Sequence, residues 1–166
     1  MPPKVPSAHI EFVTPATPTE LLATRKIFQE YAQQLGVDLG FQNFDAELDD
    51  LPGEYATPQG ALLLALVDGE LAGCCAMRQL ISSDYPNACE MKRLFVRDSH
   101  RRTGLGRRLA ECIIDAGRIA GYHHILLDTL NEMESARALY ADLGFEEIAP
   151  YYHNPIAGAH YLKATL

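Results

Sequence analysis

The amino-acid sequence predicts a single α/β domain with a mixed, mostly antiparallel sheet of six to seven strands and helices on both of its faces. Strand-like apolar runs alternate with amphipathic segments in the order β-α-α-β-β-β-α-β-α-β-β, without an internal repeat or a linker. The 166 residues, 48% hydrophobic and 22% charged, suit one globular domain with a sizeable core. We expect this domain to cover residues 8–166 and the proline-rich residues 1–7 to be flexible.

The first third of the chain predicts a short strand and two helices. Residues 10–13 form the strand, which a proline-containing turn ends. A helix opens near Thr19, keeps its apolar residues roughly on one face and stops at Gly36. A second, more acidic helix is expected over residues 44–51, where a Pro-Gly pair follows.

The middle of the chain changes to strands. Residues 61–67 are a continuous apolar run, Asp68-Gly69 is a strong two-residue hairpin turn, and residues 70–80 form the returning strand. After a loop, a further strand is expected over residues 89–96.

The last part predicts two helices and three strands. A helix over residues 104–120 ends at Gly121, and a second covers residues 132–143. The strands are expected over residues 124–130, 145–148 and 160–165. Since a strand-helix-strand crossover joins parallel strands, the strands at 89–96 and 124–130 should be parallel.

Composition argues against several classes of protein. The net charge of -8 disfavours nucleic acid as a partner, because binding of phosphates requires a basic surface. No apolar run is long enough to span a membrane and no signal peptide is visible, so we expect a cytoplasmic protein. The four cysteines and six histidines lack metal-ligand spacing; we expect buried, reduced thiols and no metal.

One segment departs from this acidic background. Seven basic residues fall within 17 positions and indicate one site for a small anion: Lys92, Arg93, Arg97, Arg101, Arg102, Arg107 and Arg108. Such a run is usually a solvated charged face, but this one contains glycines.

Those glycines lie in the segment Arg101-x-x-Gly104-x-Gly106, between a predicted strand and a predicted helix. A helix N-terminus offers unpaired N–H groups and a positive dipole end, and glycines let an anion approach the backbone closely. A Rossmann fingerprint would need glycine at position 109, which is leucine, and a P-loop would need a Gly-Lys-Ser/Thr ending, which is absent. We interpret the segment as a pyrophosphate-binding turn.

The pattern R/Q-x-x-G-x-G/A in this position resembles the GNAT superfamily of acetyl-CoA-dependent N-acetyltransferases. Two neighbouring motifs strengthen the resemblance. Ala136-x-x-Leu139-Tyr140-x-x-x-Gly144-Phe145 is similar to the signature of the family's fourth helix, and residues 90–96 are similar to its fourth strand. The element order matches the family from about residue 8 to residue 166, so the resemblance covers nearly the full chain. The segment Pro150-Tyr151-Tyr152-His153-Asn154-Pro155 is also similar to small bacterial members, many of unassigned substrate.

The resemblance implies a site for acetyl-CoA. The turn would present backbone N–H groups to the pyrophosphate, and the fourth strand would pair with the pantetheine arm where it splays from the fifth strand. Met133 occupies the position of a family asparagine that contacts the cofactor; either Asn131 replaces that asparagine or the contact is absent. The implied cofactor-binding residues are Leu94, Phe95, Val96, Arg101, Arg102, Thr103, Gly104, Leu105, Gly106, Arg107, Asn131, Ala136 and Tyr140.

The resemblance also implies catalytic roles. Glu90 matches a position where some members carry a general base, and apolar neighbours should raise its pKa; the alternative is a carboxylate paired with Lys92. Tyr140 would protonate the departing thiolate of CoA, or else be a packed tyrosine. A backbone N–H near Phe95 would polarise the thioester carbonyl.

We therefore expect an N-acetyltransferase that moves the acetyl group of acetyl-CoA to the amine of a small molecule or an amino-acid-like acceptor. Acceptor specificity should lie in the first two helices and in the late loops, including Tyr151 and Tyr152. A non-catalytic acyl-CoA sensor and a protein amino-group acetyltransferase are the alternatives, and a homodimer is possible.

Overall fold

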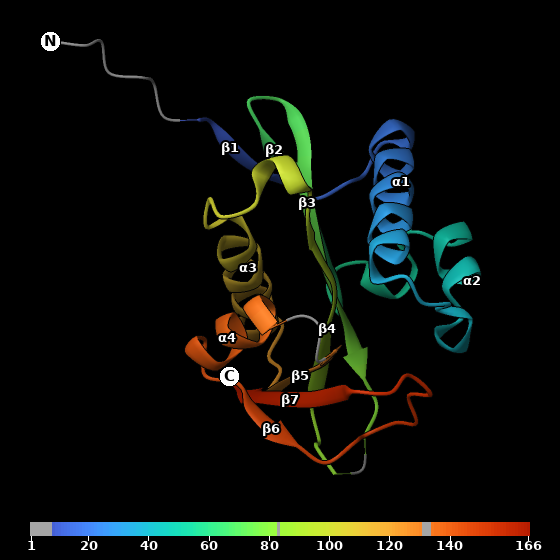
Figure 1. Ribbon diagram of the computed structural model, residues 1–166, viewed down its shortest axis with the longest axis vertical. Coiled ribbons are helices and arrows are strands. Elements are labelled where there is room, and N and C mark those ends of the chain that lie inside the picture. Colours follow the sequence, from blue (N-terminus) through green and yellow to red (C-terminus); the bar gives the residue numbers. More distant parts are fainter. Residues whose placement is uncertain (1–7, 83, 131–133) are drawn as a thin grey trace, which may run out of the picture.

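The computed structural model describes residues 8–82, 84–130 and 134–166, and shows one open sheet with helices on both faces (Figure 1). The strands are β1 (Ile10–Val13), β2 (Ala61–Val67), β3 (Glu70–Leu80), β4 (Ala88–Val96), β5 (His124–Leu130), β6 (Glu146–Ile148) and β7 (Ala159–Thr165). The helices are α1 (Pro18–Leu35), α2 (Phe44–Asp49), α3 (Leu105–Ile119) and α4 (Glu134–Asp142). Short 3-10 turns lie at Gly40–Gln42, Gly53–Tyr55 and Asp98–His100.

The seven strands follow the order β1-β2-β3-β4-β5-β7-β6. Strands β4 and β5, which α3 connects, are parallel, and every other neighbouring pair is antiparallel. The predicted fold class and element order are confirmed. None of the helices in the described ranges is long and apolar enough to cross a membrane.

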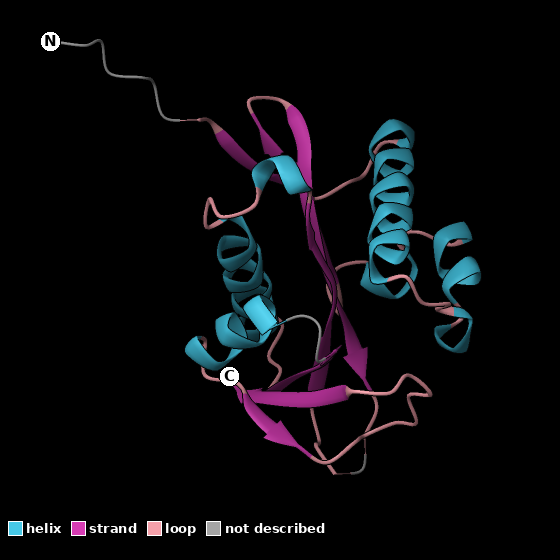
Figure 2. Ribbon diagram, viewed as in Figure 1, coloured by secondary structure: helices cyan, strands magenta, loops and turns pink. Residues whose placement is uncertain are grey.

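Helices α1 and α2 cover one face of the sheet, and α3 and α4 cover the other (Figure 2). Both faces are therefore buried, which explains why β2 is apolar at every position instead of alternating. Leu62 and Leu64 pack in the cluster under α1 and α2, whereas Ala61 and Ala65 pack in the cluster under α3.

The helix ends differ in detail from the prediction. Helix α1 begins at Pro18, one residue before the predicted start near Thr19, because Thr17 forms a capping box with Glu20. Helix α2 ends at Asp49 instead of residue 51, because a residue that precedes proline disfavours the helical backbone. The predicted start of α4 at residue 132 lies outside the described residues, as does the predicted flexible segment 1–7.

Two irregularities of β4 prepare a site. Its pairing with β5 covers only residues 88–90 against residues 124–126, and the two strands then separate. Against β3, Ala76 pairs with Lys92 but Cys74 pairs with Phe95, so β4 carries one extra residue. Arg93 in this bulge has a left-handed backbone with φ of 62°.

Candidate active site

A groove of about 730 Å³ opens where β4 and β5 separate. Strand β4, helix α1, helix α4 and the turn before α3 line it. The lining residues are Tyr31, Gln34, Leu35, Leu94, Phe95, Val96, His100, Arg101, Arg102, Gly104, Gly106, Arg107, Leu130, Ala136, Leu139 and Tyr140.

The turn before α3 has the backbone that an anion site requires. Gly104 is the N-cap of α3, with φ of 80°, and within the described ranges no side-chain hydrogen bond caps this helix end, whose first N–H groups have no partner inside the helix. A Cβ atom at Gly104 would meet no atom within 4 Å, so the space beside it is open. The backbone of Arg102 is also in the left-handed conformation, with φ of 63°. The dipole of α3 and these N–H groups together favour a phosphate group.

The basic cluster of the sequence is divided between two places. Arg101, Arg102 and Arg107 line the groove. Arg93 does not line the groove: it is buried and forms a bidentate pair with Glu47 on α2, with both N–O distances 3.0 Å. The interpretation of the whole run as one anion site was therefore too broad, because Arg93 and Arg97 already pair with carboxylates on α2 and α1.

Tyr140 lies at the inner end of the groove, on α4. Its ring is buried and packs edge-on against Phe145, with the ring centroids 5.6 Å apart. Its hydroxyl makes no hydrogen bond to another described residue. Burial, together with the neighbouring Cys75, Tyr31 and Asp128, raises the pKa of Tyr140, so the hydroxyl keeps its proton at neutral pH.

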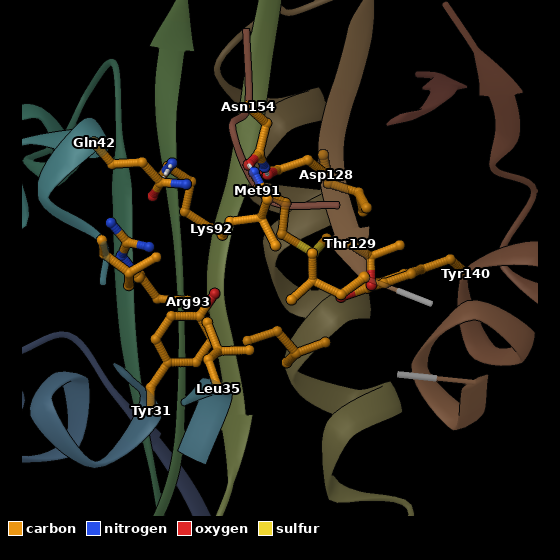
Figure 3. Close-up of a pocket in the computed structure, with 15 residues that line it drawn as sticks. Tyr31, Leu35, Gln42, Met91, Lys92, Arg93, Asp128, Thr129, Tyr140 and Asn154 are labelled. Atoms are coloured by element: carbon orange, nitrogen blue, oxygen red, sulfur yellow. Dashed lines mark hydrogen bonds between the residues drawn. The ribbon is translucent and has the colours of Figure 1, made fainter. Parts of the chain in front are cut away.

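A smaller cavity of about 50 Å³ adjoins the groove, and Figure 3 shows the residues that line it. It shares with the groove Tyr31, Leu35, Leu94, Leu130 and Tyr140. Its other lining residues are Leu39, Gln42, Met91, Lys92, Arg93, Leu127, Asp128, Thr129, Asn154 and Ile156. Tyr140 thus stands at the junction of a long groove and a small polar chamber.

Hydrogen bonds join the walls of this chamber. Tyr152, from the loop between β6 and β7, donates a 2.5 Å hydrogen bond to the carboxylate of Asp128 on β5. The side-chain amide of Gln42 donates to the Tyr152 hydroxyl at 3.3 Å, and its oxygen accepts from the Lys92 ammonium at 3.1 Å. The α1–α2 connection and the late loop therefore meet over the chamber.

Glu90 lies beneath this network and lines neither cavity. Its carboxylate, 2% exposed, accepts hydrogen bonds from Arg78 at 2.9 Å and from Tyr151 at 2.7 Å. Burial alone would raise the pKa of Glu90, but Lys92, Arg78 and the Tyr151 hydroxyl together lower it. The expectation of a raised pKa was wrong, because the buried carboxylate has charged partners that the strand pattern does not reveal.

Most of the residues predicted to bind the cofactor are brought together along the groove, from Leu94 on β4 to Ala136 on α4. Two predicted residues do not line it: Thr103 turns its hydroxyl to the carbonyl of His100, and the Leu105 side chain is buried in the core. Asn131 lies outside the described residues.

Sequence reasoning did not single out Asp128 and Gln42, two polar residues that line the chamber. Asp128 is the one carboxylate in β5, whose other residues after His124 are uncharged. Because charged side chains are rare inside buried strands, this position could have indicated a functional residue. Gln42 carries no such signal, because the 3-10 turn that positions it has no motif. Tyr151 and Tyr152, which were predicted to belong to the acceptor region, donate hydrogen bonds to the carboxylates of Glu90 and Asp128.

Comparison with known proteins decides the family. The family model described as Acetyltransferase (GNAT) family matches residues 23–145, well over half of the chain. The chain belongs to the GNAT acetyltransferase family. An uncharacterised N-acetyltransferase of Schizosaccharomyces pombe is 40% identical over 150 residues, which are 90% of each chain.

Solved GNAT structures share this fold. An acetyltransferase from Streptococcus agalactiae superposes with a TM-score of 0.76 at 20% identity, over 95% of this chain and 98% of that one. A putative acetyltransferase from Salmonella typhimurium, solved with its cofactor acetyl-CoA, has a TM-score of 0.67 at 18% identity, over 94% and 93%. The sequence-based predictions of GNAT membership and of an acetyl-CoA-dependent acyltransferase are confirmed.

Proposed function

We propose that this GNAT protein transfers the acetyl group of acetyl-CoA to the amine of a small molecule or an amino-acid-like acceptor. One observation carries the proposal: a groove that starts at an open helix N-terminus ends at Tyr140, where a small polar chamber begins. The groove suits a long phosphorylated ligand, and the chamber suits the reactive end of a second, smaller one.

Each part of the groove has a role in this proposal. The first turn of α3, with Arg101 and Arg102 at its rim, would bind the pyrophosphate. Beyond Glu90, where β5 has separated from β4, the free edge of β4 would pair with the pantetheine arm as an added strand. A backbone N–H near Phe95 would polarise the thioester carbonyl.

Tyr140 would act as the general acid. The raised pKa of its hydroxyl keeps the proton in place until a thiolate leaves, and its place between groove and chamber is where that sulfur would lie. Glu90 remains a less direct candidate for the base, because it lines neither cavity.

Binding and turnover test the proposal separately. Acetyl-CoA should raise the melting temperature of the protein, because a ligand that binds only the folded state stabilises it by mass action. Release of free CoA thiol should then depend on both acetyl-CoA and an added amine. Binding without turnover on any amine would identify a sensor, whereas absence of both would contradict the cofactor site itself.

A further inference from the structure

The carboxylate of Asp128 differs from the other carboxylates around the site. Glu90, Glu47 and Glu30 each pair with an arginine at 3.0 Å or less. From the described part of the chain, Asp128 accepts side-chain hydrogen bonds from two neutral groups, the Tyr152 hydroxyl at 2.5 Å and the Asn154 amide at 3.1 Å. Among the described residues no cation lies within 4 Å of it. A partly buried carboxylate that lacks a counter-ion favours the arrival of one.

Lys92 on β4 lines the same chamber as Asp128 on β5, and the Lys92 side chain turns toward Gln42 (Figure 3). Its side chain is 4% exposed, and its ammonium donates to Gln42 at 3.1 Å. The nearest carboxylate, Glu90, is 3.9 Å away and is held more closely by Arg78 at 2.9 Å. An ammonium has three donors, so Lys92 retains capacity for an anionic partner inside the chamber.

The chamber therefore presents a carboxylate on the β5 side and an ammonium on the β4 side. Its volume of about 50 Å³ admits only a few non-hydrogen atoms, because one water needs roughly 10–15 Å³ of such space. A ligand that satisfies both charges in so small a space carries an ammonium and an anionic group a few bonds apart.

Building on the proposed function, we propose that the acceptor is a small zwitterionic amine of the α-amino-acid type. Its ammonium binds Asp128, and its carboxylate binds Lys92 and Gln42. Tyr152 and Asn154 hold the Asp128 carboxylate in place. Asp128, in contact with the reacting nitrogen, is also the group that removes its first proton.

The proton balance of the transfer closes with these residues. The ammonium gives one proton to Asp128, and the freed lone pair forms the C–N bond to the thioester carbonyl carbon. As the C–S bond breaks, Tyr140 donates its proton to sulfur and regains one from the nitrogen. Asp128 then releases its proton to solvent, so one ammonium and one thioester yield an amide, a thiol and one proton.

The test measures binding of matched probes to the protein–CoA complex by titration calorimetry. Each amino acid is paired with the analogue lacking its carboxylate and the analogue lacking its amine: alanine with ethylamine and propionate, leucine with isoamylamine and isocaproate, phenylalanine with phenethylamine and hydrocinnamate. At least one amino acid should bind about tenfold more tightly than both of its analogues, which corresponds to roughly 1.4 kcal/mol.

Two variants assign the charges. Asp128→Asn keeps the shape of the side chain and should lower the affinity for that amino acid about tenfold or more. Lys92→Met should reduce the affinity for the amino acid to that of its amine analogue. Asp115→Asn, the same change on the exposed outer side of α3, should leave all affinities unchanged. CoA affinity should stay constant in every variant, which also shows that the fold is intact.

The inference is overturned if an amine binds the parent as tightly as its amino acid, if no amino acid binds, or if Asp128→Asn binds like the parent. The proposed function fails differently: acetyl-CoA does not bind, or CoA thiol is released with no amine at all. The two failures therefore have separate readouts.

Discussion

The carboxylate of Glu90 on β4 accepts a 2.7 Å hydrogen bond from the hydroxyl of Tyr151, a residue 61 positions later in the chain. The other carboxylate oxygen accepts from Arg78, which also pairs with Glu54 at 2.8 Å. Glu90 thereby joins β3, β4 and the late loop beneath the chamber. These contacts favour a supporting role for Glu90 over direct proton transfer.

Glu90→Gln should lower the free energy of unfolding at neutral pH by about 3–5 kcal/mol, because Arg78 and Lys92 lose a buried counter-charge. Since the pKa of Glu90 is lowered in the folded state, its contribution is present above the unfolded value near 4.3. The contribution is lost as the pH falls through the folded pKa. Urea titrations should therefore show parent and variant converging in acid.

Glu54→Gln is the matched control, because it removes the exposed partner of the same arginine. Glu54→Gln should lower the free energy of unfolding by less than about 1 kcal/mol. If Glu90 is instead the general base, Glu90→Gln lowers the rate at neutral pH and recovers part of it at high pH, where more amine is deprotonated. That profile with unchanged stability would contradict the supporting role.

Tyr140→Phe should reduce kcat roughly 10²- to 10⁴-fold and leave acetyl-CoA affinity nearly unchanged, because the ring and its packing remain while the proton donor is lost. Since the pKa of Tyr140 is raised, the parent should show no loss of rate from this group up to about pH 10. Tyr122→Phe removes a hydroxyl that bonds the carbonyl of Gln59, away from both cavities, and should retain full kcat. An undiminished rate in Tyr140→Phe would exclude the acid role.

Gly104→Asp should abolish acetyl-CoA binding, because it places a carboxylate where the pyrophosphate would meet the N-terminus of α3. The control is Gly69→Asp in the hairpin turn, since both glycines have positive φ, 80° and 82°, and open space beside them. Both variants should lose similar stability, but only Gly104→Asp should fail to bind in calorimetry. Equal binding by the two would place the anion elsewhere.

The sequence was sufficient for features that depend on neighbouring residues. The Asp68-Gly69 hairpin turn and the ends of β2 and β3 were predicted to the residue, because two-residue turns constrain the backbone directly. The turn at Gly104 was predictable for the same reason. These local rules place the groove but not the chamber.

The chamber depends on contacts between distant residues, which periodicity does not encode. Gln42 meets Tyr152 across 110 positions, and Tyr152 meets Asp128 across 24. The pKa of Glu90 was predicted in the wrong direction for this reason, since Arg78 lies on the neighbouring strand. The basic cluster was interpreted as one site for the same reason, since the carboxylates that pair with Arg93 and Arg97 lie on α2 and α1, far away in the sequence.

Arg93 offers the most direct test of how the chamber's walls are held. Its guanidinium makes two 3.0 Å hydrogen bonds to Glu47 on α2 and lies over the rings of Tyr31 and Phe44, 5.5 and 5.0 Å from their centroids. Arg93→Lys keeps the charge but loses the planar, two-pronged contact. We expect urea titrations to show a free energy of unfolding about 2–4 kcal/mol lower, because the Arg93 side chain is 1% exposed and the lysine leaves Glu47 imperfectly paired.

A double-mutant cycle of Arg93→Lys with Glu47→Gln should give a coupling energy of roughly 0.5–3 kcal/mol. The control is Arg25→Lys, in the exposed pair with Asp49, which should lower the free energy of unfolding by less than about 1 kcal/mol. Because Arg93 lines the chamber and not the groove, Arg93→Lys should also raise the KM for the amine more than the KM for acetyl-CoA. Strictly additive losses of stability in the double variant would show that Arg93 and Glu47 do not act as a pair.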